Sequence, residues 1–366
     1  MNASNSSLAE SPAPQAASLV DHARDLDADG RHDGAVDALR RAAGLGHPGA
    51  MNELGSRLLI GRNAPLSHAE GAQWLSRAAE RDNVDALTLM ATLTAAGALA
   101  APDWPAALDY LQRAAALGSA NARAQLRLLA GRADAGDDGD PDRWRSLAEA
   151  FEPAPWIAPP VRRPICETPR IRMTERGASD AICDWLRARA EGRMRPAMMY
   201  DGVSKTEQID PHRTCSDYQF DILNTDLVLL LVRERIAALT KLPTVAMEPP
   251  RVFHYALGEE IKPHYDRCGD GVQGYGEEGG YLGDRIVTFL LYLNDDFDGG
   301  ELEFPKTGFR CRGQKGDAVY FAHIDPAGKP DPLSLHAGLK ITRGDKWVLS
   351  QWIHDRPFGV KTPPSS

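Results

Sequence analysis

Residues 285–305 read RIVTFLLYLNDDFDGGELEFP, and this stretch decides the fold class of the C-terminal half of the chain. It contains two runs of aliphatic and aromatic residues, separated by a cluster of Asn, Asp and Gly that is typical of a turn. The pattern therefore predicts two short strands. Further runs of the same kind surround it, and they are RVFHYAL from residue 251, DAVYF from residue 317 and KWVLSQWI from residue 346.

Two segments with helical patterning come before most of these strands. SDAICDWLRARAEG begins at Ser179, a residue type that caps helix N-termini, and its large apolar residues fall on one face. DLVLLLVRERIAALTKL begins at Asp226 and predicts a second helix. Two helices followed by many short strands favour a double-stranded β-helix of the jelly-roll class, with helices supporting one sheet. We place this domain at residues 166–358.

The N-terminal half of the chain repeats itself. LRRAAGLGHPGA starts at Leu39, LSRAAERDNVDA at Leu75 and LQRAAALGSANA at Leu111, so equivalent positions recur every 36 residues. Paired Ala residues let two helices approach closely, which predicts an α-helical repeat solenoid over residues 18–131. Such an array offers a surface to a peptide or protein, or forms an interface with the next domain or another subunit. The sequence leaves these alternatives open.

The remaining segments have little to bury. Residues 1–17 are rich in Ser, Ala, Pro and Asn, so we expect a disordered tail. Residues 132–165 are first acidic and then proline-rich, which favours an extended linker with a capping helix near Trp144. Residues 359–366 are expected to form a second tail. The chain is thus predicted to be multidomain, with an α-helical half followed by an α+β half.

Composition excludes several classes of protein. The net charge of -9 and the pI of about 5.6 argue against a general nucleic-acid binder, which would have a basic surface. No apolar run approaches the roughly 20 residues of a membrane span. The five cysteines include no Cys-x-x-Cys pair, and the N-terminus does not resemble a signal peptide. We therefore expect no disulfide framework and a cytoplasmic protein.

The residues that could hold a metal ion lie in the C-terminal half. His264 and Asp266 are two positions apart in KPHYDRC, so on a strand they point to the same face, and His336 follows 70 residues after Asp266. Two His and one carboxylate on one side of an ion leave open positions for a bidentate 2-oxo acid and O2, as in non-haem Fe(II) oxygenases. His-x-Asp alone occurs often by chance, so the surrounding sequence has to support this interpretation.

The segment TRGDKWVLSQWIHDRP supplies that support. Lys346 lies ten residues after His336 and could pair with the distal carboxylate of 2-oxoglutarate. Alternate residues of a strand share a face, so Lys346, Val348, Ser350 and Trp352 are expected on the same side. We therefore expect the side chains of Lys346 and Trp352 in one pocket.

The stretch from Arg251 to Pro357 resembles the catalytic core of the prolyl 4-hydroxylase family of 2-oxoglutarate oxygenases. The matching motifs are RTCSDYQF, YALGEEIKPHYD, RIVTFLLYLNDDFDGGELEFP, GDAVYF and DPLSLHAGLKITRGDKWVLSQWIHDRP. With the two helices, the resemblance covers about residues 168–358. The N-terminal repeats resemble the Sel-like branch of the tetratricopeptide superfamily.

The resemblance to prolyl 4-hydroxylases implies roles for individual residues. His264, Asp266 and His336 would be the iron ligands, and Lys346 would bind the C5 carboxylate of 2-oxoglutarate. The other implied roles are hydrogen bonding to the cosubstrate for Tyr255 and Tyr292, lining of its pocket for Thr288, packing near the iron for Trp352, substrate contact for Arg213, and a tight turn for Gly299–Gly300.

Each of these residues also has a plainer interpretation. A Tyr, Thr or Trp on an apolar strand is usually part of the core, and Arg213 could form an ordinary salt bridge. His254, His323 and His354 are assigned to structural roles, with His354 exposed. Cys268 is also expected to be structural, because a thiolate would disfavour this kind of site. The resemblance further implies that the Gly-rich, acidic loop after Cys268 closes over the substrate.

The resemblance implies a hydroxylase that uses Fe(II), 2-oxoglutarate and O2, with ascorbate as reductant, and releases succinate and CO2. The expected substrate is a prolyl residue of a peptide or protein that the helical repeats help to hold. One alternative is a hydroxylase of a small molecule, such as a free amino acid or a biosynthetic intermediate. Another is an inactive scaffold whose repeats bind a partner. The sequence leaves the oligomeric state open.

Overall fold

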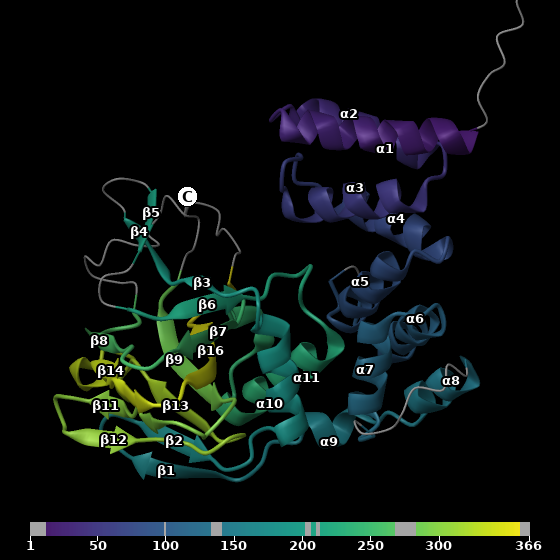
Figure 1. Ribbon diagram of the computed structural model, residues 1–366. Coiled ribbons are helices and arrows are strands. Elements are labelled where there is room, and N and C mark those ends of the chain that lie inside the picture. Colours follow the sequence, from purple (N-terminus) through teal and green to yellow (C-terminus); the bar gives the residue numbers. More distant parts are fainter. Residues whose placement is uncertain are drawn as a thin grey trace, which may run out of the picture. The chain divides into compact units, whose positions relative to one another are not determined.

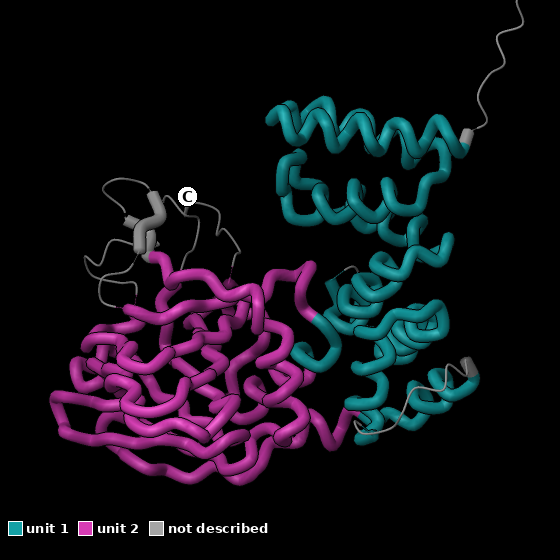
Figure 2. Tube along the Cα trace, viewed as in Figure 1, with its two compact units in different colours: residues 1–152, 226–230 teal, residues 153–225, 231–366 magenta. Residues whose placement is uncertain are grey.

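The computed structural model describes residues 12–98, 100–132, 141–201, 206–209, 213–267 and 283–358. The chain divides into two compact units (Figure 2). Unit 1 comprises Met1–Glu152 together with Asp226–Leu230, and unit 2 comprises Pro153–Thr225 together with Leu231–Ser366. None of the described helices combines the length and the apolar character that a membrane-spanning segment requires.

Unit 1 is a series of paired α-helices (Figure 1), in which α1 packs on α2, α3 on α4 and α5 on α6. The repeated leucines and alanine pairs lie in α2, α4 and α6 and are buried. The turn after each copy caps the next helix, because the side chains of His47, Asn83 and Ser119 each accept a backbone hydrogen bond. The predicted solenoid is therefore confirmed. The helices are α1 (Pro12–Ala28), α2 (His32–Gly44), α3 (Pro48–Ile60), α4 (His68–Glu80), α5 (Val84–Ala95), α6 (Trp104–Ala116), α7 (Ala120–Leu129) and α8 (Pro141–Glu149).

Two of the expected boundaries need correction. The predicted tail 1–17 ends early, because α1 begins at Pro12, a residue well tolerated in a first helical turn. The predicted linker 132–165 contains the expected capping helix as α8, but also α9 (Pro153–Ile157) and β1 (Arg162–Cys166), so much of it is not extended linker. Residues 1–11, 133–140 and 359–366 lie outside the described residues.

Unit 2 contains two main antiparallel sheets. The large sheet has the order β1-β2-β13-β9-β16-β7-β6-β3, and the small sheet has the order β12-β11-β14-β8. Two further two-stranded sheets pair β4 with β5 and β10 with β15. The strands are β2 (Ile171–Thr174), β3 (Arg195–Pro196), β4 (Met198–Asp201), β5 (Thr206–Ile209), β6 (Ser216–Gln219), β7 (Arg251–Tyr255), β8 (Ile261–His264), β9 (Arg285–Tyr292), β10 (Asp298–Gly299), β11 (Leu302–Phe304), β12 (Phe309–Cys311), β13 (Ala318–Ala322), β14 (His336–Gly338), β15 (Ile341–Arg343) and β16 (Lys346–His354).

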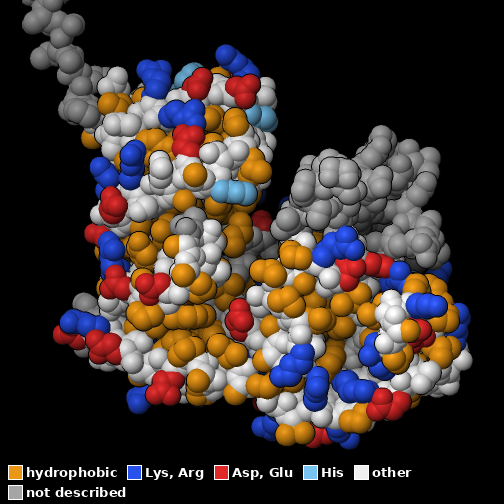
Figure 3. Space-filling model, turned by 180° about the vertical axis from the view of Figure 1, so that it is seen from behind, with side chains coloured by type: hydrophobic (Ala, Val, Ile, Leu, Met, Phe, Trp, Pro, Cys, Tyr) orange, Lys and Arg blue, Asp and Glu red, His pale blue; other side chains and the backbone are white. Residues whose placement is uncertain are grey.

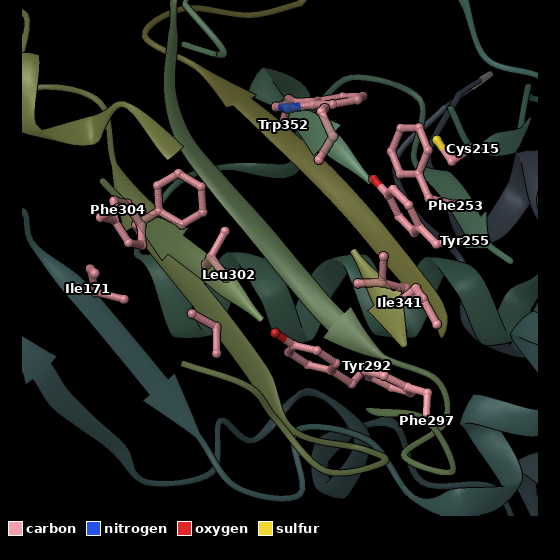
Figure 4. Packing of buried hydrophobic residues seen from close by; sticks show 14 of the residues in the cluster. Ile171, Cys215, Phe253, Tyr255, Tyr292, Phe297, Leu302, Phe304, Ile341 and Trp352 are labelled. Carbon is pink, nitrogen blue, oxygen red and sulfur yellow. The ribbon is translucent and has the colours of Figure 1, made fainter. Parts of the chain in front are cut away.

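The core of unit 2 lies between the two main sheets (Figure 4). Phe304 of the small sheet meets Phe321 of the large sheet edge to face, with ring centroids 5.1 Å apart. On the large sheet, the rings of Phe253 and Trp352 also meet edge to face, at 5.9 Å. Such pairs stabilise by about 0.5–1.5 kcal/mol beyond their buried area. Strands that follow one another along the chain, such as β7 and β8 or β13 and β14, lie in different main sheets. This arrangement confirms the predicted jelly-roll.

Helices α10 (Asp180–Ala190) and α11 (Leu227–Thr240) support the large sheet, as expected (Figure 1). The Cys183 thiol of α10 lies 3.6 Å from the carbonyl of Tyr292 in β9. Near the end of α11, the carbonyl of Leu239 accepts a hydrogen bond from the Tyr320 hydroxyl of β13. The cysteines that the structure describes are free thiols, and they are Cys166, Cys183, Cys215 and Cys311.

Candidate active site

The two candidate histidine ligands are brought together by strand pairing in the small sheet. In the antiparallel pair of β8 and β14, His264 lies directly opposite His336, so both side chains leave the same face. Asp266 lies two residues after His264, the last residue of β8. Its two carboxylate oxygens lie 3.3 Å from Nε2 of His264 and 3.4 Å from Nε2 of His336. One donor atom from each residue lies within 4.8 Å of the others, close enough for all three to contact one ion.

Backbone carbonyls fix which nitrogen of each imidazole faces Asp266. Nδ1 of His264 lies 2.9 Å from the carbonyl of Lys262, and Nδ1 of His336 lies 3.0 Å from the carbonyl of Ser334. A carbonyl only accepts, so each Nδ1 carries the hydrogen and each neutral ring keeps its Nε2 lone pair. Metal-binding histidines are commonly oriented in this way.

The charge states of Asp266 and His264 also suit a cation. Burial would raise the pKa of Asp266, but His336 and His264 outweigh it and hold that pKa well below its usual range. Burial, followed by the neighbouring His336, lowers the pKa of His264. At neutral pH the site thus offers an ionised carboxylate beside a neutral imidazole, the forms that bind divalent metals.

A cavity of about 50 Å³ extends from these residues between the two sheets. Lys346 lines it and is buried, with Nζ donating a hydrogen bond to the carbonyl of Gly300 at 2.7 Å. Among the described residues, no carboxylate lies within salt-bridge distance of this lysine. Burial lowers its pKa to about 8. A buried cation without a counter-ion is costly, so this position favours an anionic ligand.

Aromatic residues lie beside the ammonium group of Lys346. Nζ of Lys346 lies 5.3 Å from the ring centroid of Tyr292 and 5.6 Å from that of Tyr255. Burial raises the pKa of Tyr292, so its hydroxyl remains a donor, and it has no hydrogen-bond partner among the described residues. The indole N–H of Trp352 likewise has none. Two buried donors and an ammonium group fit a ligand that carries carboxylate oxygens.

The structure brings most of the expected site residues into this cavity. Those that line it are Arg213, Tyr255, His264, Asp266, Thr288, His336, Lys346 and Trp352. Tyr292 is placed beside Lys346. The hydroxyl of Thr288 donates to Asp266 at 2.5 Å, a contact that the sequence did not predict. The guanidinium carbon of Arg213 lies 4.9 Å from the ring centroid of Phe253.

The prediction that His354 is exposed is wrong. Its side chain is buried, and Nε2 lies 2.7 Å from a carboxylate oxygen of Glu248. Glu248 also accepts two hydrogen bonds from Arg285, whose guanidinium carbon lies 4.2 Å from the ring centroid of Trp352. All nine residues of β16 are buried, so the burial of His354 follows from the central place of this strand in the large sheet. Sequence alone does not show the order of strands in a sheet.

His254 and His323 have different surroundings. Nε2 of His254 lies 2.9 Å from the carboxylate of Asp345, outside the cavity, in agreement with a structural role. His323 is completely buried, and Nε2 lies 2.7 Å from the Thr288 hydroxyl. The sequence analysis did not predict this contact. His323 continues the alternation of Val319 and Phe321, two core residues of β13, and this pattern could have indicated that its side chain points into the core. Cys268 and nearly all of the loop after it lie outside the described residues.

Comparisons with known proteins agree with this geometry. Residues 250–354 match the model of the 2OG-Fe(II) oxygenase superfamily. Probable prolyl 4-hydroxylase 6 of Arabidopsis thaliana is 32% identical over 212 residues, which cover 53% of this chain and 72% of that protein. The solved structures that match include two with low TM-scores. The viral collagen prolyl hydroxylase of Paramecium bursaria Chlorella virus-1 scores 0.40 at 22% identity, covering 52% of this chain and 98% of that one. A Sel1 repeat protein from Oxalobacter formigenes scores 0.31 at 25% identity, covering 39% and 61%.

The superfamily match spans the segment from β7 to β16 and therefore contains His264, Asp266, His336 and Lys346. The chain belongs to the prolyl 4-hydroxylase-like family of the 2OG-Fe(II) oxygenase superfamily and is a 2-oxoglutarate-dependent dioxygenase.

Proposed function

We propose that unit 2 binds Fe(II) through His264, Asp266 and His336 and hydroxylates prolyl residues of a peptide or protein. One observation carries the metal assignment: two imidazole Nε2 atoms and an ionised carboxylate converge while each Nδ1 is held by a backbone carbonyl. This donor set suits Fe(II) and leaves open positions for other ligands.

Lys346 is the proposed anchor of 2-oxoglutarate. Its buried ammonium group would pair with the C5 carboxylate, and the hydroxyl of Tyr292 would donate to the same group. Tyr255, whose ring centroid lies 5.6 Å from the ammonium nitrogen, would also bind the cosubstrate, and Trp352 would close the pocket near the metal. This assignment is supported by the absence of a carboxylate partner for Lys346 in the described part of the chain.

The protein's contribution to catalysis would be position and exclusion of water. When bound, Fe(II) with 2-oxoglutarate and O2 supplies oxidative decarboxylation to succinate and CO2 and the oxidising power for C–H hydroxylation. Lys346 would hold the cosubstrate in one orientation. Thr288 would keep the carboxylate of Asp266 in place by its hydrogen bond. The apolar walls from Phe253, Leu302 and Val348 would keep the cavity dry.

The proposed substrate is polypeptide because the plant relative, at 32% identity, is named a probable prolyl 4-hydroxylase. Arg213 lines the cavity and is the proposed contact to that substrate. On unit 1, Leu45, Leu66 and Leu117 are exposed, and Figure 3 shows hydrophobic side chains among charged ones on one face of this unit. Such surfaces favour contact with a peptide or protein, so we propose that the repeats help to hold the substrate or a partner.

The test of the substrate proposal is hydroxylation of proline-rich peptides by the full chain with Fe(II), 2-oxoglutarate and ascorbate. We expect peptide-stimulated succinate release, with one oxygen atom added to a prolyl residue by mass spectrometry. His264→Ala should abolish both signals, whereas His22→Ala, at an exposed histidine of α1, should preserve them. Succinate release that no peptide stimulates would contradict a polypeptide substrate and favour a small molecule.

A further inference from the structure

His323 is held firmly next to the proposed metal site by its own backbone. It directly follows β13, where its N–H donates to the carbonyl of Ile286 and its carbonyl accepts from the N–H of Asp331, both at 2.9 Å. Its side chain is completely buried, and its ring packs edge to face on Phe321 at 5.2 Å. The imidazole therefore has little freedom to turn or to reach solvent.

The hydrogen bonds from this ring can run in only one direction. A carboxylate that binds a metal can only accept, so the 2.5 Å contact with Asp266 makes the Thr288 hydroxyl the donor. A hydroxyl has a single hydrogen. The 2.7 Å contact between Thr288 Oγ1 and Nε2 of His323 must then be donated by the imidazole. The chain of donors is His323, then Thr288, then Asp266.

This direction separates His323 from the two proposed metal ligands. His264 and His336 donate through Nδ1 and keep Nε2 for a metal, whereas His323 donates through Nε2. Its Nε2 also lies farther from Asp266, at 3.8 Å. Its Nδ1 has no hydrogen-bond partner among the described residues. The geometry thus fits a residue that acts on Asp266 through Thr288, and it does not fit a third imidazole ligand.

We propose that His323 is a positioning residue, which fixes the Thr288 hydrogen toward Asp266 and so holds the carboxylate in its metal-binding orientation. This inference rests on the proposed function, because it concerns the same metal site. Without the imidazole donor, the Thr288 hydroxyl could turn to another acceptor, and Asp266 would lose a charge-assisted hydrogen bond. Partners that orient metal ligands in this way commonly affect metal affinity by about 10- to 100-fold.

The test measures Co(II) affinity of the full chain by titration of the metal-free protein, with Co(II) as an oxygen-stable probe for the Fe(II) site. His323→Leu removes the donor, and we expect it to weaken Co(II) binding roughly 10- to 100-fold. His323→Gln places an amide N–H near the position of Nε2, so this variant should bind Co(II) within a few-fold of the wild type. A purely structural role for the ring would not predict this rescue.

A double-mutant cycle tests whether His323 acts through Thr288. Thr288→Val keeps the side-chain shape but removes the hydroxyl, and it should weaken Co(II) binding as well. Because the two residues form one chain, the double variant should bind Co(II) no more weakly than Thr288→Val alone. Independent effects that multiply in the double variant would overturn the proposal. Circular dichroism and thermal unfolding check that each variant is folded, and His323→Asn replaces His323→Leu if the latter fails to fold.

The outcomes distinguish this inference from the proposed function. Wild-type protein that binds Co(II), with loss of binding in Asp266→Ala, would support the metal site. If folded His323→Leu then binds Co(II) as tightly as wild type, the positioning role is wrong and the metal site stands. If the wild type itself binds no Co(II), the proposed metal site is the part that fails.

Discussion

At the residue scale, alternation along strands explains most of the candidate site. The expectation that Lys346 and Trp352 share a face is confirmed, because both line the cavity together with the intervening Val348 and Ser350. A period of two is a local property of one strand, so sequence reveals it. The contact of His323 with Thr288 joins two different strands and depends on their register. That register is a property of the folded sheet, and sequence alone did not show it.

The charge of Lys346 should determine affinity for 2-oxoglutarate. Hydrogen bonds to charged groups contribute about 1.5–3 kcal/mol, so Lys346→Met should raise the KM for 2-oxoglutarate by roughly 10- to 100-fold. Succinate release at varied 2-oxoglutarate measures this change. Lys340→Met serves as the matched control, because Lys340 is exposed and does not line the cavity. An unchanged KM in Lys346→Met would show that Lys346 does not bind 2-oxoglutarate.

The same lysine should give the reaction a pH dependence. Burial lowers the pKa of Lys346 to about 8 in the free protein, so the group is an ammonium below that pH and a neutral amine above it. The KM for 2-oxoglutarate should therefore rise as the pH increases through about 8, while kcat at saturating cosubstrate should not follow. Lys346→Arg stays charged and should abolish this rise. A pH-independent KM in the wild type would contradict the assignment.

At the element scale, the sequence predicted the long, strongly patterned segments and missed the short ones. The helical repeats and the strands near the metal site follow from periodicity. β1 falls in the predicted linker because its segment is rich in proline, including Pro164, but it is an edge strand, where proline is tolerated. The two-residue strands β3 and β10 have no pattern of their own. Their partners in the sheet define them.

Close packing of α3 on α4 should make one glycine sensitive to substitution. A Cβ added at Gly55 would lie 2.8 Å from a side-chain carbon of Leu75 and 2.9 Å from the carbonyl of Gly71. Gly55→Ala should therefore lower the free energy of unfolding of unit 1 by about 1–3 kcal/mol. Urea unfolding followed by circular dichroism measures the loss. Gly44→Ala, at a helical glycine with open space around it, should not be destabilising, and an equal loss there would contradict the packing argument.

At the scale of the whole molecule, the residues proposed to bind the metal and the cosubstrate lie in unit 2, whereas the helical repeats lie in unit 1. A ligand stabilises the folded state that binds it, by about 2.7 kcal/mol when its concentration is 100 times Kd. Adding Co(II) should therefore slow hydrogen exchange in β8 and β14, which carry the proposed ligands. Hydrogen exchange with mass spectrometry should show no matching protection in α3 and α4. Protection confined to unit 1 would place the metal elsewhere.

We propose that His264, Asp266 and His336 hold the catalytic metal of this 2-oxoglutarate-dependent dioxygenase. The most direct measurement is succinate formation from 2-oxoglutarate by the full chain with Fe(II), for the wild type and for Asp266→Ala. We expect Asp266→Ala, shown to be folded, to form no succinate above background, while the wild type and His22→Ala do. Succinate formation by Asp266→Ala at the wild-type rate would show that Asp266 does not hold the catalytic metal.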